Sequence, residues 1–367
     1  MSAGQHVRSP RLSAVLKTLR AMHTRSPILE GCTSFRCVLA LATLALGLAL
    51  TVSAATQRPA GTLPLRHVGD YPLPGATTRW DYLSLDPTRS RLFVAHLGDS
   101  AVVVVDTKTK GVLATISNIR HVHGTLAVPE LDRVYASATG TDEIVAIDAA
   151  TLRIVARIPG GIYPDGVAYA PELGKLYVSD ETGNTETVID ARTSQRITTI
   201  ALGGAVGNTQ YDPVSKHILV NVQGRGILAE IDPRTDQVVD RIPLPGAEGN
   251  HGLLIVPKLR LAFIACEGDS RLLVLSLNTR QVVASFGVGQ TPDVVAYDAA
   301  LGWLYVASES GVLTIFKVEA AGVAKIGEGW VGPNAHSLAI DPATHEIYLP
   351  LPDIDHHPVM RVLKPDT

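Results

Sequence analysis

RLFVAHLGDSAVVVVDTKTKGVLATI, from Arg91 to Ile116, is a short β-type run, a turn with glycine, and a second β-type run that ends at an aspartate, followed by a threonine-rich turn and a third β-type run. The same order returns from Arg133 as RVYASATGTDEIVAIDAATLRIVARI. Its opening motif returns at Lys175 as KLYVSDETGN and at Trp303 as WLYVASESGV. The chain is therefore built from an internal repeat.

Another apolar run that ends in a turn precedes each repeat. Equivalent residues anchor seven such runs, namely Asp86, Val128, Ala170, Asp212, Val256, Asp298 and Asp341. Successive anchors are 42, 42, 42, 44, 42 and 43 residues apart, which leaves room for four short strands per repeat. Seven units of this period predict an all-β fold, a seven-bladed β-propeller of four-stranded antiparallel blades.

The last repeat is one strand short. It offers strands at Ser337–Ile340, Glu346–Leu349 and Val359–Leu363, whereas a β-type run at Leu65–Gly69 precedes the first repeat. We expect this N-terminal run to be the outer strand of the seventh blade, because that pairing closes the ring and removes an open sheet edge. No helix of useful length is predicted in the repeats.

Length and composition fit one such domain. The chain has 367 residues, of which 46% are hydrophobic and 5% aromatic, so the core must consist mainly of Val, Ile, Leu and Ala. The net charge is −3, and the repeats contain no long basic run. We therefore expect neither nucleic acid nor a membrane surface as a partner, and we expect a monomer.

The N-terminal region has the pattern of a secretory signal. Arg36 precedes the apolar run CVLALATLALGLALTV (Cys37–Val52), and small residues follow it at Ser53–Ala55. We assign residues 1–54 to a signal peptide, with Met22 as an alternative start, residues 55–64 to a linker and 65–367 to the propeller. The alternative is a membrane anchor, but the run is short for a span. The mature chain is thus expected in the periplasm or outside the cell, without a stable membrane span.

A single cysteine, Cys266, remains after removal of this segment. An exported chain with one cysteine forms no internal disulfide. Because Cys266 ends the apolar run LAFIAC, we expect it to be a buried small hydrophobic residue.

The motifs LYVSD and LYVAS, followed by V-x-V-x-D and T-x-x-V-x-x-I, resemble the YVTN-type repeats of bacterial periplasmic and archaeal surface propellers. The resemblance covers roughly Leu63–Leu363 and is closest to the exported YncE-like group of that family. It implies a propeller fold and export. It implies no settled activity, because propellers carry enzymes, binding modules and scaffolds alike.

Polar residues recur five positions before the anchors. This first ring consists of Asp81, His123, Asp165, Gly207, His251, Asp293 and His336, with Asn208 beside the glycine of the fourth repeat. Because repeats of a propeller are related by rotation about its channel, these side chains should converge at one mouth of the channel. Small residues follow several of them (Gly124, Gly166, Gly252 and Ser337), which would let a ligand approach closely.

Three interpretations of the first ring remain open. Imidazole and carboxylate groups suit a divalent metal ion, for which His123, His251 and His336 are the candidate ligands. The same groups suit a metal-free pocket for a small ligand. A structural interpretation is that each polar residue hydrogen-bonds a neighbouring backbone turn.

A second ring follows the second strand of each repeat. It contains His96, Glu181, Gln223, Glu267, Glu309 and Asp353. Since the second strand returns toward the start of the first, this ring should lie on the same face and make it polar and acidic. His356 and His357, in the last repeat, are further candidates for that rim.

The motifs of known catalytic sites are absent from the sequence. It has no G-x-S-x-G, Walker loop, dinucleotide fingerprint or H-E-x-x-H. We therefore expect a propeller that binds a small ligand, metal or protein partner at its channel face. The alternatives are a metal-assisted hydrolase or lactonase-like enzyme that uses the same ring, and a structural or protein-interaction scaffold.

Overall fold

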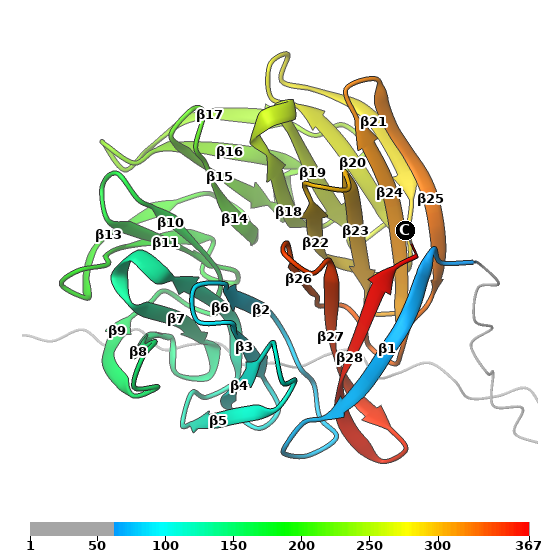
Figure 1. Ribbon diagram of the computed structural model, residues 1–367. Coiled ribbons are helices and arrows are strands. Elements are labelled where there is room, and N and C mark those ends of the chain that lie inside the picture. The colour runs from blue at the N-terminus through cyan, green and yellow to red at the C-terminus, as the bar shows by residue number, and fades with distance from the viewer. Residues whose placement is uncertain (1–61, 367) are drawn as a thin grey trace, which may run out of the picture. The chain divides into compact units, whose positions relative to one another are not determined.

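The computed structural model describes residues 62–366, which form seven β-sheets arranged in a ring (Figure 1). Each of these sheets has four antiparallel strands, which confirms the seven-bladed propeller. The helical elements of residues 62–366 are turns of three residues, none of which has the length or apolar character needed to cross a membrane. The predicted signal peptide and most of the predicted linker lie outside the described residues.

Four strands that follow one another in the chain make each of the first six blades. The first three blades are β2 (Leu83–Asp86), β3 (Arg91–His96), β4 (Ala101–Asp106), β5 (Val112–Ser117); β6 (Val122–Val128), β7 (Arg133–Ala138), β8 (Glu143–Asp148), β9 (Ile154–Pro159); and β10 (Pro164–Ala170), β11 (Lys175–Asp180), β12 (Thr185–Asp190), β13 (Gln195–Ala201). The next three are β14 (Val206–Asp212), β15 (His217–Val222), β16 (Ile227–Asp232), β17 (Gln237–Pro243); β18 (Asn250–Val256), β19 (Leu261–Cys266), β20 (Arg271–Ser276), β21 (Gln281–Gly287); and β22 (Pro292–Asp298), β23 (Trp303–Ser308), β24 (Val312–Glu319), β25 (Gly322–Trp330). The short turns are η1 (Pro129–Leu131), η2 (Thr139–Thr141), η3 (Gln223–Arg225) and η4 (Pro257–Leu259).

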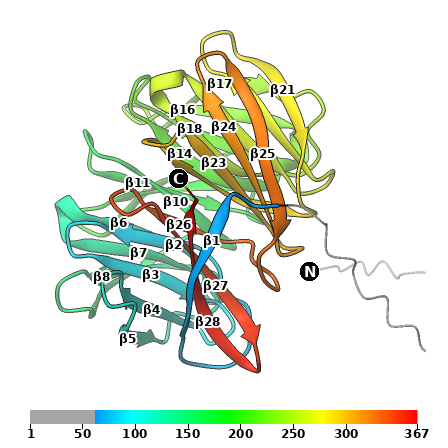
Figure 2. The same cartoon turned by 45° about the vertical axis from the view of Figure 1, so that its right-hand side comes forward.

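The seventh blade combines both ends of the propeller. Its strands are β26 (Ala339–Asp341), β27 (Glu346–Ile354), β28 (His357–Pro365) and β1 (Leu65–Pro72), and β1 is the outer strand. Figure 2 shows β1 in blue beside β28 in red, and their register runs from Leu65 opposite Pro365 to Pro72 opposite Val359. The predicted closure of the ring by the N-terminal strand is therefore confirmed.

The hydrophobic core lies between the blades. In most blades the two middle strands are apolar on both faces, as in AVVVVD of β4, because a neighbouring blade covers each face. Phe93 and Val104 of the first blade, for example, share a buried cluster with Val134 and Val145 of the second. Cys266 belongs to such a cluster and is fully buried, as expected. Its burial raises the pKa of the thiol to about 12.

A bulge interrupts the inner strand at the same place in several blades. In the second blade Val122 pairs with Ala138 and Thr125 with Ala136, so that two residues of β6 lie opposite one residue of β7. The inner strands β10, β14, β18 and β22 show the same shift. A bulge turns a side chain away from the plane of its sheet. The bulged positions include five members of the first ring, namely His123, Asp165, Gly207, His251 and Asp293, so the local backbone turns these residues away from their sheets.

Candidate site at the channel mouth

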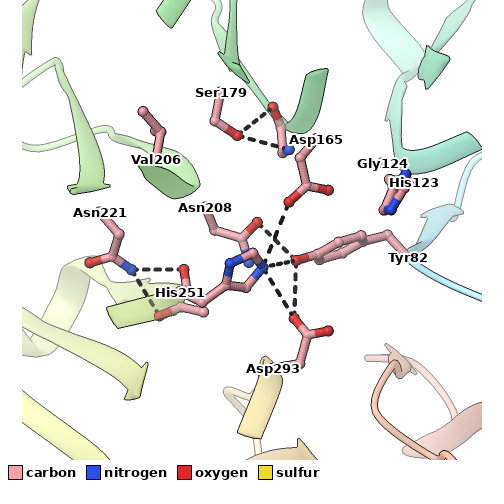
Figure 3. Close-up of polar contacts among 12 residues, drawn as sticks. Tyr82, His123, Gly124, Asp165, Ser179, Val206, Asn208, Asn221, His251 and Asp293 are labelled. Atoms are coloured by element: carbon pink, nitrogen blue, oxygen red, sulfur yellow. Dashed lines mark hydrogen bonds and ion pairs between the residues drawn. The ribbon is translucent and has the colours of Figure 1, made fainter. Parts of the chain in front are cut away.

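Five residues of the first ring form a chain of alternating carboxylates and imidazoles. His336 Nε2 lies 3.9 Å from Oδ2 of both Asp81 and Asp293. His251 Nε2 lies 3.6 Å from Asp293 Oδ1 and 3.6 Å from Asp165 Oδ2 (Figure 3). All five are buried, although they come from five different blades. The structure thus brings together Asp81, Asp165, His251, Asp293 and His336.

Tyr82 connects this chain across the channel. Its hydroxyl oxygen is 2.9 Å from Asn208 Oδ1, 3.1 Å from Asp293 Oδ1 and 3.2 Å from His251 Nε2 (Figure 3). A residue that precedes the first inner strand therefore reaches side chains of the fourth, fifth and sixth blades. Asn208 takes the place beside Gly207 that the sequence indicated. We call these seven residues the mouth cluster: Asp81, Tyr82, Asp165, Asn208, His251, Asp293 and His336.

His123 lies apart from the chain of alternating charges. Its Nδ1 is 3.0 Å from the backbone oxygen of His121 and 2.8 Å from Thr139 Oγ1, and its Nε2 is 3.3 Å from the Tyr163 hydroxyl. The rings of His123 and Tyr163 are 5.2 Å apart between centroids. These two residues, with Arg79 and Thr139, help line a pocket of about 340 Å³.

Residues of the second strands satisfy much of the backbone at the bulges. The amide N–H of Gly124 donates to Ser137 Oγ, and that hydroxyl donates to the backbone oxygen of Asp165. Ser179 bonds the N–H of Gly166. The Asn221 amide donates to the backbone oxygens of His251 and Gly252 in the next blade (Figure 3). The carboxylates of the first ring are therefore not needed to hold these turns.

The imidazoles of His123 and His336 do contact local backbone. Nδ1 of His336 is 2.9 Å from the backbone oxygen of Asn334, the same two-residue contact that His123 makes with His121. The structural interpretation, in which the side chain hydrogen-bonds a neighbouring backbone turn, thus holds for Nδ1 of each histidine. It leaves Nε2 of His336 facing Asp81 and Asp293.

The small residues after the ring positions have a packing role. A Cβ atom at Gly124 would lie 2.2 Å from the backbone oxygen of Asp165, and one at Gly252 would lie 1.9 Å from that of Asp293. The inner strand of the next blade fills the space that the sequence suggested for a ligand. Glycine is required there because neighbouring backbones touch.

Burial and charge act in opposite directions on the ionisable groups. Burial lowers the pKa of His251, but Asp293, Glu267 and Asp165 outweigh it and raise that pKa to about 9. Burial likewise opposes the net rise in the pKa of His336, which Asp81 and Asp293 produce. For Asp165 burial dominates over His251 and raises the pKa to about 6. The charged form of His251 is therefore the favoured state at neutral pH.

Most of the second ring lies beside the mouth cluster. The side-chain amide nitrogen of Gln223 is 2.8 Å from His251 Nδ1. Glu309 accepts a hydrogen bond of 2.6 Å from Arg79, whose Nε is 3.3 Å from Asp81 Oδ2. Glu181 and Glu267 are close enough to His251 to raise its pKa, and burial raises the pKa of Glu267 itself to about 7. These residues make the mouth acidic.

Four residues of the expected rim lie elsewhere. His96 is buried, with its ring stacked on Trp80 at 3.7 Å and its Nε2 2.9 Å from Thr78 Oγ1. Burial lowers the pKa of His96. Asp353 is exposed near the end of β27, and its carboxylate accepts the N–H of His356, which is exposed in the following turn. Exposed His357 begins β28.

Two sets of three side chains in residues 62–366 bring potential metal ligands within 4.8 Å of one another. One is Asp81, Asp293 and His336, and the other is His251, Glu267 and Asp293. The candidate ligands His123, His251 and His336 do not form such a set. His123 is kept away by its contacts with Thr139 and Tyr163.

Sequence reasoning missed Tyr82, Arg79 and Tyr163. A signal existed for Tyr82, which is the only aromatic residue at a position that is glycine or serine in four of the other six repeats and Asn208 or Val294 in the remaining two. Arg79 and Tyr163 lie in loops before the inner strands, each seven residues before its anchor, Asp86 or Ala170. The other repeats have no common residue type at that offset, so it gave no signal. Only the folded chain brings them beside Asp81 and His123.

Comparison with known proteins supports the fold alone. No family model matches the sequence, and no curated protein matches it. The hydrazine synthase structure from Kuenenia stuttgartiensis is 15% identical with a TM-score of 0.67, and the match covers 76% of this chain and 94% of that one. The WD40 repeats of RRP9 are 12% identical with a TM-score of 0.69, and the match covers 82% of this chain and all of that one. Both resemblances are those of β-propellers.

Proposed function

We propose that this protein is an exported binding propeller that holds a small organic ligand, cationic or rich in hydrogen-bond donors, at its channel mouth. The ligand would contact the side of the mouth cluster formed by Tyr82, Asp165, Asn208 and His251. Export rests on the signal pattern before Thr56, and the resemblance to YVTN-type repeats agrees with it.

The observation that carries the proposal is an acceptor without a partner. Asp165 is 2% exposed, and its Oδ1 has no hydrogen-bond partner among the described residues. Its other oxygen faces His251, whereas Oδ1 points away from that ring (Figure 3). A buried carboxylate oxygen without a donor is costly. A ligand N–H or O–H would supply the missing donor.

The charge of the surroundings favours the same class of ligand. Six carboxyl groups gather at the mouth, on Asp81, Asp165, Glu181, Glu267, Asp293 and Glu309, against one guanidinium group and the imidazoles of His251 and His336. A site with an excess of carboxylates attracts amines and guanidinium groups and repels anions. The ligand class therefore follows from the excess of carboxylates.

A metal-assisted hydrolase remains the alternative function, since a metal at this mouth would activate water. A scaffold is the third possibility, because propellers commonly bind protein partners. Both make different predictions. A metal-assisted hydrolase would lose its activity when the metal is removed. A scaffold would bind a protein partner without contact between a small molecule and Asp165 or Tyr82.

The test is a thermal-shift and calorimetric screen of small amines, polyamines and guanidinium compounds, with matched carboxylates as negative probes. The protein is purified without a polyhistidine tag and treated with chelator, so that metal plays no part. We expect cations to raise the melting temperature and Asp165→Asn to reduce their affinity at least tenfold. That loss corresponds to about 1.4 kcal/mol, within the range for a charged hydrogen bond.

Asp353→Asn is the matched control, because Asp353 is an exposed aspartate near the end of β27, outside the mouth cluster. It should bind the same ligands as the parent protein. Equal binding by the parent protein and Asp165→Asn, or preference for the carboxylate probes, would contradict the proposal.

A further inference from the structure

We propose that Asp81, Asp293 and His336 form a binding site for one divalent transition-metal ion on the blade-seven side of the channel mouth. This inference rests on the proposed function, because the ion would share the mouth and Asp293 with the organic ligand. It replaces the three-histidine set with one imidazole and two carboxylates.

The first support is a buried nitrogen without a partner. His336 is 1% exposed, and its Nε2 has no hydrogen-bond partner among the described residues. That atom faces Asp81 Oδ2 and Asp293 Oδ2, each at 3.9 Å. Direct hydrogen bonds require about 3.2 Å or less. His336 Nε2 therefore makes no direct hydrogen bond to either carboxylate, and the three atoms face one another at distances that leave a metal ion as a common partner.

The second support is the orientation of the imidazole. Nδ1 of His336 is 2.9 Å from the backbone oxygen of Asn334, so the N–H at Nδ1 donates to that carbonyl. A histidine that ligates a metal usually donates its other N–H to a carbonyl or carboxylate, which fixes the ring and its tautomer. In the neutral ring, the contact with Asn334 leaves the lone pair of Nε2 directed at the two carboxylates, and a metal ion would take the place of the Nε2 proton of the charged ring.

The separations suit a metal after a small contraction. Zinc bonds of about 2.0–2.2 Å in tetrahedral geometry place neighbouring ligand atoms roughly 3.4 Å apart. The pairs formed by His336 Nε2 are 3.9 Å apart, and all three ligand atoms lie within 4.8 Å of one another. Side-chain movements of about half an ångström would bring His336 Nε2 to that distance from each carboxylate oxygen. Three protein ligands leave a position for water or the organic ligand.

The mixed ligand set selects the kind of ion. One imidazole nitrogen with two carboxylate oxygens suits Zn²⁺ and Mn²⁺. Mg²⁺ keeps most of its water and prefers oxygen, and Ca²⁺ takes six to eight oxygen ligands. We therefore expect Zn²⁺ or Mn²⁺ to bind well above Mg²⁺ and Ca²⁺.

Arg79 competes with the ion for Asp81. Its Nε is 3.3 Å from Asp81 Oδ2, the oxygen that faces His336, while its Nη1 pairs with Glu309 at 2.6 Å. Metal binding would break the first contact and retain the second. Removal of the guanidinium group should therefore tighten metal binding, because it removes a cation that already neutralises one of the ligands.

The test is calorimetric titration of chelator-treated, untagged protein with Zn²⁺ and Mn²⁺ alone. We expect one ion per chain, a loss of affinity of ten- to a hundredfold or more in His336→Gln and Asp81→Asn, and a gain of roughly threefold in Arg79→Gln. The gain separates a metal site from a folding defect, because a damaged fold does not bind more tightly.

Arg157→Gln is the matched control for Arg79→Gln. The two arginine side chains are equally exposed at 37%, and Arg157 pairs with Glu143 at 3.0 Å, away from the cluster. It should leave metal affinity unchanged. The inference would be overturned if the parent protein bound no stoichiometric metal in the titration, or if the parent protein and His336→Gln had equal metal affinity.

The two proposals fail separately. Asp165-dependent binding of organic cations without metal binding would reject the metal site and keep the proposed function. Metal binding that depends on His336, without any organic ligand, would reject the proposed function and keep the metal site.

Discussion

At the scale of single residues, the mouth cluster depends on a residue that breaks the repeat. Tyr82 stands where four other blades have glycine or serine and the remaining two have Asn208 and Val294. Its hydroxyl lies among Asn208, His251 and Asp293. Burial, followed by the charges of Asp293 and Asp165, raises the pKa of Tyr82 well above its usual range. Tyr82 therefore stays protonated and donates one hydrogen bond to the cluster.

Replacement of Tyr82 by phenylalanine should lower the free energy of unfolding by about 1–3 kcal/mol, because buried acceptors lose their donor. Chemical denaturation of Tyr82→Phe measures this loss. Tyr297→Phe is the control, since the hydroxyl of Tyr297 makes no hydrogen bond to another described residue. Equal stability of the two variants would show that the hydroxyl of Tyr82 does not hold the cluster together.

Glu186 is a second exception to the repeat, outside the mouth. It lies in β12 at the position of buried Val102, Ile144 and Leu228 in other blades, and neither of its carboxyl oxygens has a hydrogen-bond partner among the described residues. Burial raises the pKa of Glu186 well above its ordinary value of 4.5. The folded state thus keeps a proton that the unfolded chain releases near pH 4.5.

Stability should therefore fall as the pH rises from the ordinary pKa of Glu186 toward its raised value in the folded state. Below pH 4.5 both states bind the proton, and Glu186 adds no pH dependence. Glu186→Gln removes the titration, so its melting temperature should exceed that of the parent protein by a margin that grows as the pH rises above 4.5. Glu319→Gln, at an exposed strand end, should not. A constant difference between Glu186→Gln and the parent protein over this range would contradict the assignment.

At the scale of strands, hydrophobic runs and turn residues predicted most elements. The predicted outer strand Val112–Ile116, for example, is β5 (Val112–Ser117). The bulges were not predicted, because one extra residue in an inner strand changes no apolar periodicity. The glycines that accompany them were noted but given the wrong role, since contact between backbones of adjacent blades depends on the fold.

Gly252→Ala should destabilise the propeller by roughly 1–3 kcal/mol or more, because the added Cβ would lie 1.9 Å from the backbone oxygen of Asp293. Gly287→Ala is the control: it also lies in a strand, and a Cβ there meets no atom within 4 Å. Urea denaturation compares the two. Equal loss in both variants would attribute the effect to alanine in general and not to the contact between blades.

At the scale of the whole molecule, the period of the repeat predicted the blade number and the closure. The first ring could be located because equivalent offsets in rotated repeats meet at one mouth. Its chemistry could not, because the distances from His336 to Asp81 and Asp293 depend on the tilt of individual blades. The exception of His123 shows this, since loop residues Thr139 and Tyr163 hold its ring nitrogens.

The ring should also depend on β1 as a whole. Arg361 of β28 donates to both carboxylate oxygens of Asp70 in β1, at 2.8 and 2.6 Å, and to the backbone oxygen of Val331. This contact joins the closing strand to the last blade and to the end of the sixth. Loss of β1 would expose the backbone edge of β28, which is a site for pairing with another chain.

A chain that begins at Gly75 should therefore unfold at a lower temperature and self-associate, whereas a chain that begins at Thr62 should remain a monomer with the stability of the parent protein. Arg361→Ala keeps β1 but removes the ion pair between Arg361 and Asp70, so its melting temperature should lie between those of the two shortened chains. Calorimetry measures the melting temperature, and light scattering measures the molecular mass. If the chain from Gly75 melts at the same temperature as the chain from Thr62, the seventh blade is stable with three strands, and closure by the N-terminal strand does not stabilise the propeller.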